Sequence, residues 1–175
     1  MLIQNYGLFW RRSDVFWGKP GTTGHLKGIK ADNAKSKAVD FRGQQGIYIL
    51  YDDNFKILYI GQAGANDHQD LFTRLRQHRR DALADRWTKF SWYGIRWVTK
   101  KGSLSAPADG AHSTKGDVLN HIEAILISAA EPSLNRQGGR WGENVEQYRQ
   151  YRDKESLGPE LNGMIADIYK RMQEY

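Results

Sequence analysis

Two short apolar runs predict a β-hairpin near the middle of the chain. Residues 46–51 and 56–61 are rich in Ile, Leu and Tyr, and a four-residue connection containing Asp and Asn separates them. Runs of this length and composition favour strands, and Asp and Asn tolerate turn geometry. With the turn at the centre of that connection, Tyr48 falls opposite Tyr59 and both phenols share one face. The other face presents only Ile and Leu, so we expect it to be the core face.

The rest of the hydrophobic pattern predicts one more strand and several helices. Alternation with a period of two favours a strand, and apolar positions repeated at three- and four-residue spacing favour an amphipathic helix. Residues 1–45 have no sustained periodicity, and 100–116 is a loop rich in Gly, Ser and Ala. The predicted elements are a strand at 90–98 and helices at 71–82, 118–130, 143–154 and 161–172.

Composition indicates one folded domain over residues 1–175. The chain is 39% hydrophobic and 26% charged, which is ordinary for a globular protein. It contains no cysteine, which excludes thiolate zinc sites, cysteine nucleophiles and disulfides. Its longest apolar stretches fall far short of the roughly 18 residues that a membrane span needs. Because the N-terminus also lacks an apolar signal-peptide core, a cytoplasmic protein with no membrane partner is expected.

Positive charge is concentrated in one part of the sequence. The net charge is +6, yet residues 71–101 alone contain nine basic and two acidic residues. Such a patch is typical of proteins that bind the phosphate backbone of nucleic acids, although a solvated helix face would look the same. The candidates for backbone contacts are Arg76, Arg79 and Arg80, with Arg136 and Arg140 in a later Gly-containing stretch.

Polar side chains of the 71–82 helix are expected to gather beside the hairpin. Arg74 and His78 are four residues apart and follow the apolar stripe that faces the sheet. A guanidinium there requires an anion, either a structural carboxylate or a substrate phosphate. The pairing of Tyr48 with Tyr59 is equally typical of a cross-strand contact that only stabilises a sheet.

Glu123 is the only charged residue of a segment, 118–130, that is apolar nearly all round. This composition indicates a buried helix, which ends before Pro132. A lone buried carboxylate costs free energy unless it is paired or binds a metal. Glu123 is therefore either the structural partner of Arg74 or a metal ligand that leaves Arg74 for phosphate, and the residues alone leave both alternatives open.

The tyrosines of the hairpin, the Arg and His of the following helix, and Glu123 resemble the motifs of the GIY-YIG nuclease family in their order and residue types. The resemblance implies an α+β fold in which a small three-stranded antiparallel β-sheet is flanked by helices. It covers residues 44–136, with 1–43 as an N-terminal extension and 137–175 as a C-terminal helical extension. The matching residues are Gly46-Ile47-Tyr48, Tyr59-Ile60-Gly61, Leu71, Arg74, Leu75, His78, Glu123 and Asn135.

The resemblance also implies the roles of individual side chains. One of Tyr48 and Tyr59 activates the attacking water, and Arg74 binds the phosphate. His78 occupies a position that holds His or Tyr in relatives, and Asn135 closes the motif set. The loop at 62–70 is longer than in the minimal module and 100–116 looks like an insertion after the third strand, so substrate preference does not carry over.

A metal-dependent endonuclease acting on DNA is the predicted function. By the resemblance Glu123 is the metal ligand, and a single carboxylate suits Mg²⁺ or Mn²⁺, which take further ligands from water and phosphate. The absence of a second domain favours a self-contained enzyme, such as a restriction-like or phage-defence nuclease, with double-stranded DNA as its expected partner. The alternatives are a catalytically inactive nucleic-acid-binding module and a nuclease acting on RNA. Both a monomer and a homodimer are compatible with the sequence.

Overall fold

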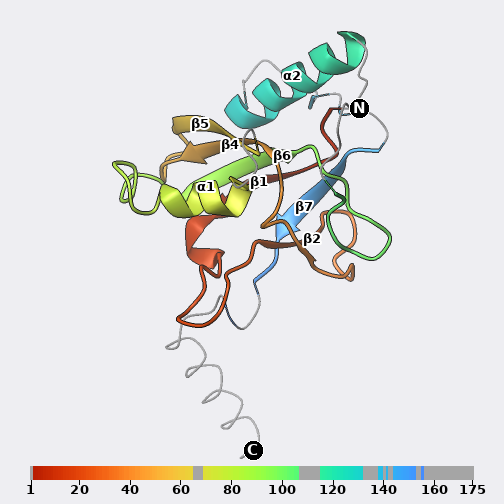
Figure 1. Cartoon of the computed structure of the whole chain (residues 1–175). Coiled ribbons are helices and arrows are strands. Elements are labelled where there is room, and N and C mark those ends of the chain that lie inside the picture. The colour runs from red at the N-terminus through yellow and green to blue at the C-terminus, as the bar shows by residue number, and fades with distance from the viewer. Residues whose placement is uncertain are drawn as a thin grey trace, which may run out of the picture.

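A seven-stranded mixed sheet forms the centre of the molecule (Figure 1). The computed structural model describes residues 2–64, 69–106, 115–131, 138–139, 141, 144–152 and 155. Strands follow the order β3-β2-β7-β1-β6-β4-β5, and only the β1–β7 pair is parallel. In chain order the elements are β1 (Asn5–Arg11), the 3₁₀ helix η1 (Arg12–Asp14), β2 (Lys27–Lys30), β3 (Val39–Asp40), β4 (Gly46–Tyr51), β5 (Ile57–Ala63), α1 (Leu71–Gln77), β6 (Lys89–Gly94), α2 (Lys115–Ala130) and β7 (Glu146–Gln150).

The predicted fold class is wrong, because the sheet is far larger than three strands. The three predicted strands do exist, as the antiparallel set β6-β4-β5 at one edge of the sheet. Residues 1–45, for which the pattern gave no assignment, contribute β1, β2 and β3, and β1 extends the set by pairing with β6. The N-terminal segment is therefore an integral part of the sheet.

The β4–β5 hairpin is confirmed, but its register differs from the prediction by two residues. Tyr48 pairs with Gly61 and Leu50 with Tyr59, and a bulge follows Leu50. The cause lies in the turn, where Asp52 Oδ1 accepts hydrogen bonds from two backbone N–H groups and Phe55 adopts a φ of 62°. A shift of two residues preserves the alternation of faces, so both phenols stay on one side.

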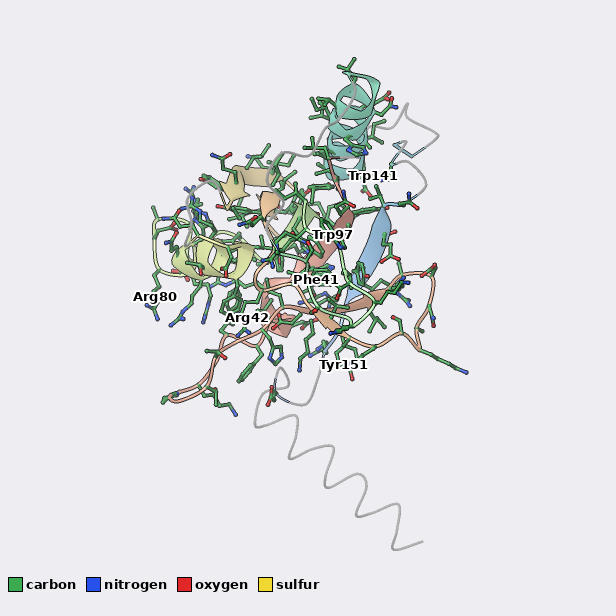
Figure 2. The ribbon with its side chains drawn as sticks, turned by 45° about the vertical axis from the view of Figure 1, so that its right-hand side comes forward. Phe41, Arg42, Arg80, Trp97, Trp141 and Tyr151 are labelled. Atoms are coloured by element: carbon green, nitrogen blue, oxygen red, sulfur yellow. The ribbon has the colours of Figure 1, made fainter. Side chains whose placement is uncertain are left out.

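The second incorrect prediction is the helix at 143–154, where the structure has strand β7. Tyr148, at the centre of β7, is buried against Phe41, with 4.6 Å between ring centroids, and its carbonyl accepts a hydrogen bond from Trp10 Nε1. Figure 2 shows Phe41 in the middle of the molecule. Long-range packing of this kind overrides the local helical preference of charged residues. The predicted helix at 161–172 lies outside the described residues.

The two helices cover opposite faces of the β6-β4-β5 set. Leu71, Phe72 and Leu75 of α1 join the core that contains Tyr48 and Leu50. On the other face, Ile125 and Ala129 of α2 pack with Ile49, Tyr51 and Tyr93. The expected core face is therefore only part of the core, since Ile47 and Ile60 are 36% and 57% exposed.

Helix α2 confirms the helix predicted at 118–130, but not its burial. His121, Ala124, Ile125 and Ala129 are buried, whereas Leu119 and Leu126 are 66% and 60% exposed. Two hydrogen bonds attach its inner side to the sheet, from Tyr51 Oη to the carbonyl of Ala129 and between Tyr93 Oη and Ser128 Oγ. Within the part of the chain that the structure describes, no helix has the length and apolar character needed to cross a membrane.

Candidate functional site

Four of the predicted site residues meet between the hairpin and α1. Tyr48 comes from β4, Tyr59 from β5, Arg74 from α1, and His78 caps the C-terminus of α1. Tyr48 Oη lies 2.8 Å from His78 Nε2, and the ring of Tyr59 lies 4.7 Å from that of His78. The two phenol rings are 6.0 Å apart. We call these four residues the tyrosine cluster.

Local structure accounts for the position of the helix in this cluster. Asp70 caps the N-terminus of α1 by accepting a hydrogen bond from the Thr73 N–H at 2.8 Å. The helix ends at Gln77, earlier than the predicted 82, because Asp81 holds a tight turn by accepting from the Leu83 N–H. The carbonyl of His78 accepts a hydrogen bond from Trp87 Nε1 at 3.1 Å, which fixes the end of the helix.

Gly61 makes room for Tyr48. A Cβ atom at position 61 would lie 2.4 Å from Tyr48 Oη and 2.6 Å from the ring of Tyr59. Separations this short are not tolerated without movement of the neighbours, so the two phenols can only reach across β5 at a residue without a side chain. This glycine of the motif thus has a direct steric explanation in the cluster.

His78 links Tyr48 to a carboxylate. Its Nδ1 lies 2.6 Å from Asp81 Oδ2. Burial acts to raise the pKa of Asp81, but the Leu83 N–H, His78 and Arg74 outweigh it, so the pKa lies below its ordinary value. Asp81 is therefore an anion at neutral pH and accepts a hydrogen bond from Nδ1–H of His78, while Nε2 of the same ring faces the Tyr48 hydroxyl. The three side chains form a continuous line of hydrogen bonds.

The two tyrosines have different access to solvent. Tyr48 is fully buried, and burial raises its pKa to about 12, although the nearby Arg74 opposes the rise. It is consequently a neutral hydrogen-bond donor at physiological pH. Tyr59 is only half-buried. Of the two phenols, Tyr59 is the one that a bound molecule could reach.

Arg74 has no carboxylate partner among the described residues. Its Nη1 donates to Gln77 Oε1 at 3.0 Å and to Gln69 Oε1 at 3.4 Å, while its buried Nε has no hydrogen-bond partner in the described part of the chain. Burial acts to lower its pKa, but Tyr48 and Tyr59 outweigh it and raise the pKa. Arg74 is therefore a permanent cation whose hydrogen bonds go to neutral groups and which lies near enough to Asp81 to lower the pKa of that carboxyl, an arrangement that leaves it able to bind a further anion.

Glu123 is not the buried carboxylate that the sequence predicts. It lies on the exposed side of α2, and α2 packs on the sheet face opposite α1. No hydrogen bond or ion pair between described residues joins it to Arg74 or to the tyrosines. Because the outer side of α2 is open, the carboxylate keeps its hydration and needs no partner.

Carboxylates are scarce near the tyrosine cluster in the part of the chain that the structure describes. The described residues contain no group of three or more His, Asp or Glu side chains placed to hold an ion. Asp81, which lies next to the cluster, is hydrogen-bonded to His78, and no interaction between described residues joins Glu123 to the cluster. A Mg²⁺ or Mn²⁺ ion with one carboxylate ligand and further ligands from water and phosphate stays a prediction.

The remaining predicted residues are distributed around the cluster. Arg76 and Arg80 are exposed, and Figure 2 shows Arg80 on the outer side of α1, directed away from the sheet. Arg79 is half-buried and lies over the ring of Trp17. Asn135, Arg136 and Arg140 lie outside the described residues.

Sequence reasoning missed Asp81, which completes the hydrogen-bonded line. Its three-residue spacing from His78 at the end of a helix was a usable signal, since side chains at that spacing are neighbours. It also missed Arg12, Trp17 and Trp87, which surround Arg79 and come from distant segments. Comparisons with protein-family models, curated proteins and solved structures found no match.

Proposed function

We propose that this chain is a nuclease that hydrolyses phosphodiester bonds in DNA at the tyrosine cluster. Two things support the proposal: the ordered resemblance of its motif residues to GIY-YIG nucleases, and the meeting of four of those residues at one place. The observation that carries most weight is an arginine that forms no ion pair among the described residues and lies beside two phenols and a histidine–carboxylate pair. A purely structural arginine at such a place would be expected to pair with a carboxylate.

In this proposal Arg74 and Tyr59 contact the substrate. Arg74 binds the non-bridging oxygens of the scissile phosphate and offsets the negative charge that grows on them during attack. Tyr59 is the accessible phenol and orients the attacking water. Tyr48 and His78 are positioning residues, because both are buried and act through the line of hydrogen bonds that ends at Asp81.

The divalent ion remains a prediction from the resemblance, and the position of Glu123 favours a second candidate function. A nucleic-acid-binding module without catalysis would keep the basic residues and the cluster but would not need a carboxylate near Arg74. Basic residues are abundant on this side of the molecule, where Arg76 and Arg80 are exposed near Arg79.

One experiment separates the two candidates. Purified protein is incubated with plasmid DNA and with a long RNA, each with Mg²⁺, with Mn²⁺ or with EDTA. The nuclease proposal expects metal-dependent cleavage of DNA that Tyr59→Phe reduces, while Tyr151→Phe, a change at an exposed tyrosine of the distant end of β7, leaves it unchanged. Binding of nucleic acid with no cleavage under all of these conditions would support the binding module. Cleavage of RNA but not of DNA would change the proposed substrate from DNA to RNA.

A further inference from the structure

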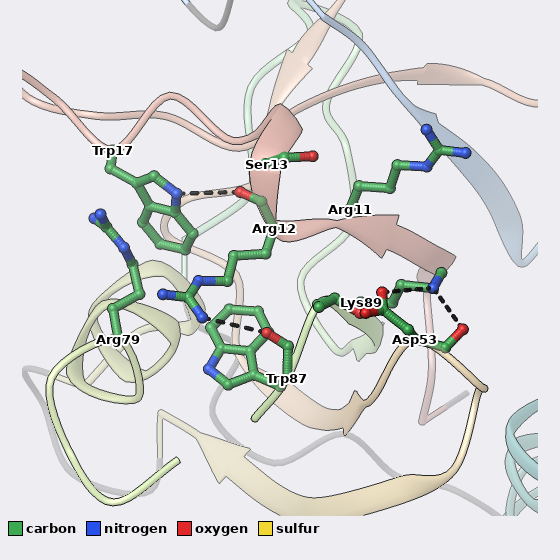
Figure 3. A pocket seen from close by; sticks show the side chains of 9 residues that line it. Arg11, Arg12, Ser13, Trp17, Asp53, Arg79, Trp87 and Lys89 are labelled. Atoms are coloured by element: carbon green, nitrogen blue, oxygen red, sulfur yellow. Dashed lines mark hydrogen bonds and ion pairs between the residues drawn. The ribbon is translucent and has the colours of Figure 1, made fainter. Parts of the chain in front are cut away.

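A pocket of about 720 Å³ lies beside the C-terminal end of α1 (Figure 3). Its walls come from the end of β1 and η1, from the turn after α1 and from the start of β6. His78 points to Tyr48, whereas the next residue, Arg79, reaches into this pocket. The lining residues are Arg11, Arg12, Ser13, Trp17, Asp53, Arg79, Trp87, Thr88 and Lys89.

Arg12 and Arg79, two of the three arginines that line the pocket, have no carboxylate partner among the described residues. The guanidinium of Arg12 donates to the carbonyls of Ala84 and Trp87, and Arg79 makes no ion pair there. The one acidic side chain of the lining, Asp53, is taken by Lys89 at 3.7 Å. Burial lowers the pKa of Arg79, and the neighbouring charges of Arg12, Arg80 and Arg76 lower it further. These cations repel one another unless an anion lies between them.

The aromatic rings of the pocket hold the arginines and leave little ring surface for anything else. Arg12 lies over the ring of Trp87 at 5.0 Å, and Arg79 over that of Trp17 at 4.5 Å. Trp17 also stacks on Phe72, with 5.6 Å between centroids and 27° between planes. A nucleobase would need a free ring face. The stacked guanidinium groups instead present their N–H edges, and the Nε of Arg79 has no hydrogen-bond partner in the described residues. This arrangement suits a tetrahedral anion with several oxygens.

We infer that this pocket is a second phosphate subsite, which binds a backbone phosphate of the nucleic acid away from the bond that is cut. The inference rests on the proposed function, because the ligand is a phosphate of the same strand that the tyrosine cluster acts on. Arg79 and Arg12 hold the phosphate, and Trp17 and Trp87 keep their guanidinium groups in place. Trp87 also donates to the carbonyl of His78, so one indole contacts both sites.

The test measures binding of a short DNA duplex in EDTA, where cleavage is suppressed. Methylphosphonate, an uncharged phosphate analogue, replaces one phosphate at a time along each strand. Wild-type protein is expected to lose about tenfold in affinity at one position beyond the scissile phosphate, in line with a hydrogen-bonded charge pair. Arg79→Gln is the main variant, because Arg79 makes no hydrogen bond within the described residues whose loss could unfold the chain. Arg12→Lys, checked by a melting curve, is the second variant.

The variant and the analogue should report the same contact. Arg79→Gln is expected to weaken binding to unmodified DNA by about the same factor, to make that one methylphosphonate position neutral, and to reduce the log–log salt slope by about 0.9. Lys101→Gln, which removes one exposed charge from the loop after β6, should leave the position pattern unchanged. If the scan of Arg79→Gln matches that of the wild type while both proteins bind and cut DNA, the subsite is refuted and the nuclease stands. If wild-type protein binds no nucleic acid, both proposals fail together.

Discussion

The two faces of the β6-β4-β5 set are built from different interactions. The α1 face holds a polar line, from Tyr48 through His78 to Asp81, within a large aromatic core. The α2 face is held by Ile, Ala and Tyr contacts, by two hydroxyl hydrogen bonds and by the buried His121, whose Nδ1 accepts from the Ile3 N–H. Buried hydrogen bonds therefore fix both faces, but on the α1 face they form a line that ends at a carboxylate.

The same difference affects the positions of two predicted site residues, Arg74 on α1 and Glu123 on α2. Arg74 is partly enclosed by glutamines and phenols, so its position is determined. Glu123 points outward from a helix whose outer side remains exposed, so its position is set by the helix alone. The proposed nuclease chemistry uses the α1 face, and variants on both faces can test whether it does.

The largest expected effect is the loss of cleavage in Arg74→Ala. Removing a preorganised cation from the scissile phosphate should reduce the cleavage rate by about 10²–10³-fold, as loss of one donor to a developing charge does elsewhere. The fold should survive, because the hydrogen bonds of Arg74 go to two glutamines. The cleavage rate is compared with that of Arg76→Ala, an exposed arginine of the same helix. Equal rates in both variants would remove Arg74 from the reaction.

Gly61→Ala tests the packing of the same face. The added methyl group would lie 2.4 Å from Tyr48 Oη, which forces either the phenol or β5 to move. We expect a loss of about 1–3 kcal/mol in the free energy of unfolding, measured by urea denaturation. Gly138→Ala is the control, since a Cβ there meets no described atom within 4 Å. Wild-type stability of Gly61→Ala would show that the cluster is loosely packed.

The sequence predicted the cluster well because its geometry is local. Alternation within β4 and β5 and the four-residue spacing of Arg74 and His78 are sufficient to direct these side chains to one side, even though the hairpin register was wrong. A register error of two residues keeps every side chain on its face. Asp81 could have been included from spacing alone.

The large sheet could not be predicted, because its strands are defined by partners far away in the chain. β7 carries Glu, Gln and Arg, and it is a strand because it pairs with β1 and β2 and buries Tyr148 against Phe41. β1 is similarly fixed by β6, which lies in the second half of the chain. The prediction that Glu123 is buried was wrong for a related reason. An apolar segment shows that a helix has a buried side, but not that all its sides are covered.

Asp81→Asn tests the polar line with a smaller expected effect. The pKa of Asp81 lies below its ordinary value, so its carboxylate stabilises the fold at neutral pH, and this contribution is lost as the pH falls through the lowered pKa. The side chain is 43% exposed, so the difference at pH 7 should be about 1 kcal/mol or less. Melting curves between pH 7 and pH 3 should show wild type and variant converging at the acid end. Asp85→Asn is the control. If Asp81→Asn and the wild type show the same pH dependence of stability, the hydrogen-bonded line from Tyr48 to Asp81 is refuted.

Glu123→Gln should have the smallest effect on stability and sharpens the comparison most. Because the side chain is exposed and makes no contact with Arg74 among the described residues, the free energy of unfolding should change by about 0.5 kcal/mol or less. Ile125→Ala, two residues further on the inner side of α2, should instead cost about 2–4 kcal/mol. A large loss of stability in Glu123→Gln would mean that the carboxylate is paired inside the fold and that the outward orientation of this side of α2 is wrong.

The same preparations are then assayed with plasmid DNA and Mg²⁺. Loss of cleavage at unchanged stability would assign Glu123 to the reaction and require that it approach the cluster when DNA is bound, whereas a wild-type rate would confine the reaction to the α1 face.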